Sequence, residues 1–168
     1  MAKPRLERRV DVDIIHELQQ SRPFRSESQE ATIALLRTAS VIGRRMARVV
    51  EPHGISLAQY NVLRILRGAG PDGLPTLAIR DRMIEEGSTV TRLLDKLESS
   101  ELVLRDRNRP DRRQVQCWIT ESGQALLTLL DPLIDEADLS TFAMLDGTSR
   151  RQFIDTLARV RMGTAPTE

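Results

Sequence analysis

Apolar residues recur with helical spacing along much of this chain, and the clearest case lies shortly after its midpoint. Val90, Leu93, Leu94 and Leu97 follow an i, i+3, i+4, i+7 pattern, which predicts a helix with one side packed against a core. The opposite side is polar and carries Ser88, Thr91, Arg92, Asp95 and Ser99, with Thr89 and Lys96 beside them. Small hydroxyl groups next to an arginine suit a helix that reaches base edges and phosphates in a major groove. An ordinary amphipathic helix with Ser88 as its N-cap is the alternative.

The pattern then changes to strands and predicts a β-hairpin. Residues 102–104 form the first predicted strand and residues 114–119 the second, in which Cys117 alternates toward the core and Trp118 away from it. The connecting segment, 105–113, contains five arginines and two aspartates. We expect this tip to bury nothing and to repel itself, so its charge is best explained by a nearby phosphate backbone. A solvated turn is the alternative.

Further helices are predicted on both sides of this unit. Apolar residues with helical spacing mark segments near 6–20, 28–50, 56–67, 76–83, 120–134 and 148–160. The inner side of the second segment carries Ile33, Leu36, Ile42, Met46 and Val49 or Val50. The first segment is short, so it either packs against other parts of the protein or frays as a tail.

Several of these helices have recognisable ends. Ser56 and Gln59 match a capping box, and Ile55 and Tyr60 stand at the positions of a hydrophobic staple. Thr120 is predicted to cap the long helix after the hairpin.

Other positions are predicted to interrupt helices. Pro132 should kink or break the long helix in which it lies. Glycines make residues 68–73 a loop, and a turn at 146–147 precedes a last helix that Thr148 or Ser149 would cap.

Composition restricts the classes of function. The 168 residues include 25 Lys+Arg and 24 Asp+Glu, so a net charge of +1 argues against binding nucleic acid through bulk charge. Aromatic residues make up 3%, which disfavours an aromatic platform that stacks single-stranded bases. No apolar run is long enough to span a bilayer and no signal-peptide core is visible, so a cytoplasmic protein without membrane partners is expected.

The chemistry of an enzyme is not apparent. His16 and His53 lie outside metal-binding or nucleophile–base spacing, and no phosphate loop or nucleophile elbow occurs. The acidic residues 135, 136 and 138 read as a solvated helix edge. The single cysteine, Cys117, excludes an internal disulfide, and a buried thiol would be inert. We therefore predict no catalytic residues, metal or cofactor.

The run Ser-Thr-Val-Thr-Arg-Leu-Leu-Asp-Lys-Leu-Glu at 88–98 precedes Asp111, Arg112 and Arg113, and then Gly123. Together these motifs resemble the MarR family of bacterial transcription regulators. The resemblance implies a mostly α fold with a β-hairpin wing. It also implies a winged helix-turn-helix at 55–120, a helical dimerisation region at 28–54 and 121–168, and an N-terminal extension at 1–27.

The resemblance also implies roles for individual residues. The recognition helix would begin at Ser88, and Arg113, oriented by Asp111, would enter the minor groove. Two positions depart from the family: Arg80 replaces a small alanine, and Glu101 replaces a glycine that would accommodate a positive φ.

We therefore predict a homodimeric repressor that binds a palindromic double-stranded DNA operator with half-sites ~34 Å apart. The family resemblance further implies that a small lipophilic or phenolic effector binds between the dimer helices and the winged helix. The predicted DNA contacts are Ser88, Thr89, Thr91, Arg92, Lys96, Arg107, Arg109, Asp111, Arg112 and Arg113. The alternative is a winged-helix interaction module whose arginines bind an acidic protein partner.

Overall fold

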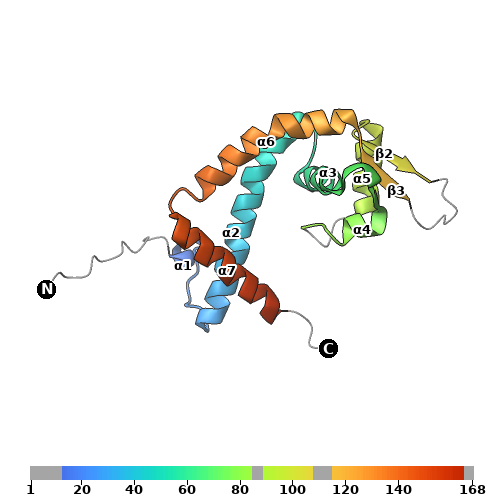
Figure 1. Ribbon diagram of the computed structural model, residues 1–168. Helices are drawn as coiled ribbons and strands as arrows, with labels where there is room; N and C mark the ends of the chain where they lie inside the picture. The colour runs from blue at the N-terminus through green and yellow to red at the C-terminus, as the bar shows by residue number, and fades with distance from the viewer. Residues whose placement is uncertain (1–12, 85–88, 108–114, 165–168) are drawn as a thin grey trace. The chain divides into compact units, whose positions relative to one another are not determined.

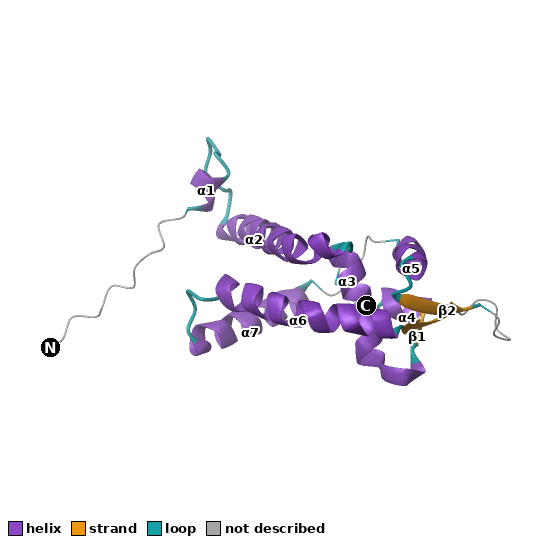
Figure 2. Ribbon diagram, turned by 90° about the horizontal axis from the view of Figure 1, so that it is seen from above, coloured by secondary structure: helices purple, strands orange, loops and turns teal. Residues whose placement is uncertain are grey.

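The computed structural model describes residues 13–84, 89–107 and 115–164 (Figure 1). Its elements are α1 (Ile14–Glu17), α2 (Glu27–Val50), η1 (Glu51–His53), α3 (Leu57–Ala69), η2 (Gly70–Asp72), β1 (Leu74–Pro75), α4 (Thr76–Arg80), α5 (Val90–Ser99), β2 (Val103–Asp106), β3 (Gln116–Ile119), α6 (Glu121–Thr141) and α7 (Gly147–Gly163). This mostly helical fold with one small antiparallel sheet confirms the predicted fold class (Figure 2).

The chain divides into two compact units, Met1–Gly43 and Arg44–Glu168. In the first unit, α1 is joined to α2 by an ion pair in which Nε of Arg37 donates to Glu17 over 2.6 Å. The predicted helix at 6–20 was too long at its C-terminal end, because the chain leaves the helix after Glu17 and Gln19 has a φ of 53°. The part of that helix before residue 13 lies outside the described residues.

The apolar stripe of α2 is buried mainly at its C-terminal end. Met46 and Val50 are buried, whereas Leu36 is 61% exposed in the single chain, although it was expected on the inner side. This difference arises because only the last part of α2, from Arg44 onward, belongs to the larger unit and its core.

The second unit is built on a core to which the end of α2, α3, α4, α5, the sheet and α6 contribute, whereas α7 has no buried residue. Its fully buried side chains are Val50, Val62, Leu63, Leu66, Ile79, Leu94, Leu97, Cys117, Leu127 and Leu130. Figure 1 shows α3, α4, α5 and the sheet grouped together, with α6 leading away from them to α7. The short helix α4 ends at Arg80 rather than at the predicted Met83, and the amide of Ile84 donates to Asn61 Oδ1 over 3.0 Å.

The sheet has the strand order β1-β3-β2, with both pairings antiparallel. In this register Leu104 lies opposite Trp118, and Cys117 lies between Leu74 and Arg105. Strand β1 was not predicted, because two residues that include a proline carry no alternating pattern. Cys117 is completely buried as expected.

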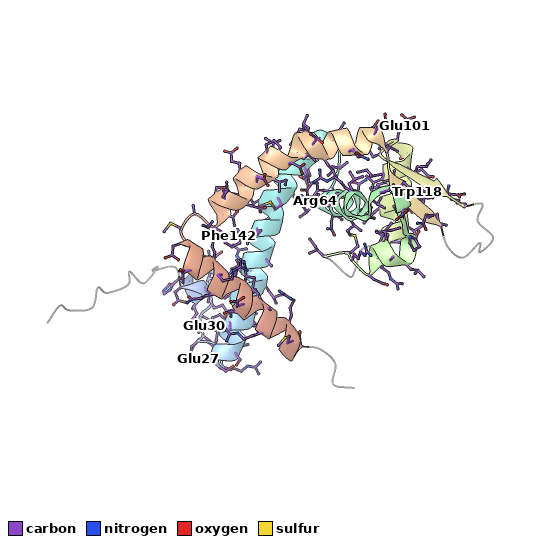
Figure 3. All side chains as sticks on the ribbon, viewed as in Figure 1. Glu27, Glu30, Arg64, Glu101, Trp118 and Phe142 are labelled. Carbon is purple, nitrogen blue, oxygen red and sulfur yellow. The ribbon has the colours of Figure 1, made fainter. Side chains whose placement is uncertain are left out.

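Trp118 lies on the other face of the sheet, where its indole Nε1–H donates to the carbonyl of Pro71 over 3.1 Å (Figure 3). This close approach depends on Gly73, which has a φ of 64°. A Cβ at Gly73 would lie 2.4 Å from the carbonyl oxygen of Cys117. A side chain at this position would therefore push the η2 loop away from the sheet.

The predicted caps of α3 and α6 are confirmed, whereas the predicted loop at 68–73 is wrong in part, because α3 continues to Ala69 and η2 follows it directly. Ser56 Oγ accepts from the amide of Gln59 over 3.2 Å, and Gln59 Oε1 accepts from the amide of Ser56 over 2.9 Å. The staple residues Ile55 and Tyr60 are both buried. Thr120 caps α6, with its Oγ1 accepting from the amide of Gly123 over 3.1 Å.

The last helices follow the predictions only in part. Pro132 lies inside α6, which continues through it to Thr141, so the proline does not end the helix. The cap of α7 is Asp146, which accepts from the amide of Ser149 over 2.7 Å, and neither Thr148 nor Ser149 has that role. A carboxylate two or three positions before the predicted caps competes better for the free amides at a helix N-terminus.

Candidate nucleic-acid interface

Helix α5 turns one polar face outward. Thr89, Arg92 and Lys96 occupy positions i, i+3 and i+7, and all three are exposed together with Thr91. On the reverse side Val90, Leu94 and Leu97 are buried as predicted, and Leu93 is half-buried. The two basic side chains are available to a ligand, since neither Arg92 nor Lys96 has an acidic partner among the described residues.

The N-terminus of α5 differs from the prediction. The helix begins at Val90 with Thr89 in the N-cap position, so Ser88 is not the cap. The hydroxyl of Thr89 makes no capping hydrogen bond with the helix. Ser88 itself lies outside the described residues.

The C-terminus of α5 contains one of the two positions that depart from the family pattern. Glu101 has a φ of 58°, the left-handed conformation for which glycine is normally selected. The amide of Glu101 donates to the carbonyl of Glu98 over 3.0 Å and that of Leu102 to the carbonyl of Leu97 over 2.9 Å, which together form a Schellman motif. The other departure is harmless, because Arg80 is exposed and pairs with Asp81 at 3.3 Å.

Strand β2 continues further into the predicted arginine-rich tip than expected. Arg105 belongs to the strand, and its side chain is only 6% exposed, so the expectation that the whole tip buries nothing was wrong. Its Nε donates to Glu98 Oε2 over 2.8 Å, and its guanidinium also pairs with Asp95. The burial is tolerated because two carboxylates neutralise the guanidinium.

Arg107 also binds Glu98. Its Nη1 donates to Oε1 over 3.1 Å and its Nη2 to Oε2 over 2.7 Å. The hydrogen bonds from Arg107 and Arg105 lower the pKa of Glu98 from 4.5 to about 2, so the carboxylate stays ionised at neutral pH. One sign of this cluster was visible in the sequence, since Asp95 and Glu98 are three residues apart and precede the arginine-bearing strand.

The remaining predicted wing residues, Arg109, Asp111, Arg112 and Arg113, lie outside the described residues. Their expected contacts with DNA therefore stay predictions. The strands that lead to and from them are β2 and β3.

A second ion-pair cluster joins α3 to α6. Asp131 accepts from Arg67 through two hydrogen bonds of 2.8 Å each, and Arg64 lies 3.8 Å away. Arg64, labelled in Figure 3, also donates to the hydroxyl of Tyr60 over 3.0 Å and lies over its ring. The hydrogen bonds from Arg67 lower the pKa of Asp131. This cluster therefore joins α3, which packs against α5, to the long helix α6.

The described part of the chain contains no metal-ligand cluster, no exposed thiol and no helix that could span a membrane. There, no group of three or more His, Cys, Asp and Glu side chains is placed to hold a metal ion. Burial raises the pKa of the Cys117 thiol, whose sulfur lies 3.8 Å from Thr76 Oγ1. None of the helices in the described ranges is both long and apolar enough to cross a bilayer.

Comparisons with known proteins agree with this arrangement. The MarR family model matches residues 55–115. The HTH-type transcriptional regulator TtmR of Methylorubrum extorquens is 33% identical over 136 residues, covering 81% of this chain and 68% of TtmR.

Solved structures show the same similarity. A MarR transcription factor from Planctomyces limnophilus is 31% identical with a TM-score of 0.62, covering 83% of this chain and 98% of that one. MepR of S. aureus, crystallised as a DNA complex, has a TM-score of 0.71 at 24% identity, covering 84% and 99%.

Proposed function

Since this chain belongs to the MarR family of transcription regulators, we propose that it binds duplex DNA sequence-specifically through α5 and the wing. The observation that carries the proposal is the exposed row formed by Thr89, Arg92 and Lys96 on a helix whose other side is buried. Such a row can enter a major groove without disturbing the core. The DNA held by MepR in its solved complex supports the same ligand class.

Within this function the residues have separate tasks. Ser88, Thr89, Thr91 and Arg92 meet base edges in the major groove, and Lys96 reaches a phosphate. Arg113, oriented by Asp111, enters the minor groove, while Arg109 and Arg112 contact the backbone. Arg107 differs from these residues, because its guanidinium already pairs with Glu98.

We further propose that the protein acts as a homodimer on a palindromic operator. Large apolar side chains on α6 and α7 are exposed in the single chain, namely Leu129, Leu133, Leu139, Ile154, Val160 and Met162. A second copy that covers them would remove this surface from water. A two-fold dimer places its recognition helices about 34 Å apart, which fits half-sites one helical turn apart.

The regulatory role is proposed as ligand-responsive repression. An effector would shift the spacing of the two recognition helices, which requires a different affinity for the two arrangements. The Arg67–Asp131 pair joins α3 to α6. A movement of α6 would reach α3, against which α5 packs, through this pair. Small lipophilic or phenolic molecules are the candidates that the family suggests.

The test is selection of bound duplexes from a random pool at physiological salt, followed by titration of the enriched sequence. We expect the wild type to enrich a palindrome, and Arg92→Ala and Arg113→Ala each to weaken its binding by roughly 1–3 kcal/mol. Arg22→Ala, which alters an exposed arginine in the first unit, is the matched control and should bind like the wild type. If the wild type enriches no sequence, or if both groove variants bind normally, the proposal fails.

A further inference from the structure

Glu98 connects the recognition helix to the wing. Its two carboxylate oxygens accept from two nitrogen donors of Arg105 and two of Arg107 over 2.5–3.1 Å, with Oε2 shared between the two residues. The two arginines belong to β2 and the residue directly after it, whereas Glu98 belongs to the last turn of α5. Besides the short connection through Glu101, this side-chain cluster holds the two elements together.

Because Arg105 is buried, its guanidinium requires the carboxylates of this cluster. Its side chain is 6% exposed, and it lies opposite Cys117 of the central strand. A guanidinium in that position needs carboxylate partners, so β2 cannot move along α5 without separating a buried charge from them. Glu98 and Asp95 therefore fix the position of the strand that leads into the wing.

The same cluster divides the basic residues near α5 into two groups. Arg107 is 55% exposed and was expected to bind a phosphate, but a bidentate carboxylate already occupies its guanidinium. Arg92 and Lys96, in contrast, lack an acidic partner within the described residues. A phosphate would have to displace Glu98 to bind Arg107, whereas Arg92 and Lys96 are ready to accept one.

We propose that Glu98 is a positioning residue for DNA recognition, which sets the wing relative to α5 by holding Arg105 and Arg107. This inference rests on the function proposed above. It also assigns Arg107 to positioning instead of phosphate contact. Loss of Glu98 would then lower the preference for the operator and release Arg107 to bind phosphates of any sequence.

Salt dependence separates this role from that of an ordinary ion pair. Each phosphate contact contributes roughly 0.9 to the slope of log affinity against log salt concentration, so one residue lost from both protomers lowers the slope by about 1.8. If Arg107 is a positioning residue, Arg107→Gln leaves the slope unchanged. A purely structural ion pair would change the melting temperature but neither the slope nor the ratio of operator to random-duplex affinity.

The experiment measures that ratio, the salt slope and the melting temperature for the full-length wild type, Glu98→Gln and Arg107→Gln. Glu27→Gln, which makes the same change at an exposed position at the start of α2, is the control and should match the wild type in all three. We expect Glu98→Gln to lower the affinity ratio on the order of tenfold, with a steeper salt slope. Arg107→Gln should lower the ratio at an unchanged slope.

Arg107→Gln alters an exposed side chain, so this arm remains decisive even if Glu98→Gln fails to fold. A slope that falls by about 1.8 would identify Arg107 as a phosphate ligand and overturn the proposal. A folded Glu98→Gln with the wild-type affinity ratio would overturn it as well. If the wild type itself selects no palindrome, the proposed function fails first, which is a separate result from the failure of Glu98 as a positioning residue.

Discussion

The hydroxyl of Thr120 donates to the carbonyl of Glu101 over 2.7 Å and accepts from the amide of Gly123 over 3.1 Å. One side chain therefore ties the left-handed residue after α5 to the first turn of α6. Figure 3 shows Glu101 beside the start of α6. The end of α5 is thus held by the beginning of α6.

Replacing Glu101 with glycine should stabilise the protein. Its φ of 58° costs a residue with a Cβ about 1 kcal/mol, and glycine removes this cost. We expect Glu101→Gly to raise the free energy of unfolding in urea by about 1 kcal/mol. Glu101→Ala is the control, because it also removes the carboxylate near the helix C-terminus but keeps the Cβ. Equal stabilities of the two variants would contradict the assignment.

Among the helical glycines in the described ranges, Gly123 should be the least tolerant of substitution. A Cβ there would lie 2.4 Å from the carbonyl oxygen of Leu102 and 2.7 Å from a side-chain carbon of Ile119. Since backbone atoms cannot easily move aside, Gly123→Ala should lower the free energy of unfolding by about 1–3 kcal/mol. The matched change Gly68→Ala in α3 meets no atom within 4 Å and should be neutral or stabilising. Similar effects of both changes in thermal unfolding would refute this difference.

The Arg67–Asp131 pair should give stability that depends on pH. Because its pKa is lowered from 3.8 in the folded state, Asp131 contributes stability that is fully present above that value. The contribution is lost as the pH falls through 3.8 and then through the lower folded value. Asp131→Asn should therefore cost about 0.5–1 kcal/mol at neutral pH, and the difference from the wild type should shrink below about pH 4. Denaturant titrations at both pH values test this, and a difference independent of pH would exclude the charge as its cause.

Cys117 should be unreactive in the folded protein. The thiol is completely buried in the central strand, and burial raises its pKa, so little thiolate is present to react. A maleimide reagent should modify it only as fast as the protein opens, and rapidly in denaturant. Fast modification under native conditions would show that the strand is accessible and would revive a role in oxidant sensing.

Patterns that depend on local spacing were visible in the sequence. The buried face of α5, the capping box at Ser56 and the inward direction of Cys117 all follow from periodicity or from residues three apart. The family resemblance added the possibility of a positive φ at Glu101, which the structure has.

Features that depend on tertiary contacts were missed. Strand β1 exists because β3 offers it hydrogen-bonding partners, and its own two residues do not encode a strand. Arg105 looked like one more charge of the wing, since only the folded chain brings it against Glu98. At α7, several capping residues follow one another closely, and the choice of Asp146 depends on the path of the preceding turn.

The hydrogen bond from Trp118 to Pro71 has a practical consequence. The chain contains one tryptophan and one tyrosine, and the tryptophan belongs to strand β3 of the wing. Its fluorescence emission therefore reports on this part of the molecule without any added label. A shift of the emission on addition of DNA or of a small molecule would follow changes around the wing, while circular dichroism would follow the helices.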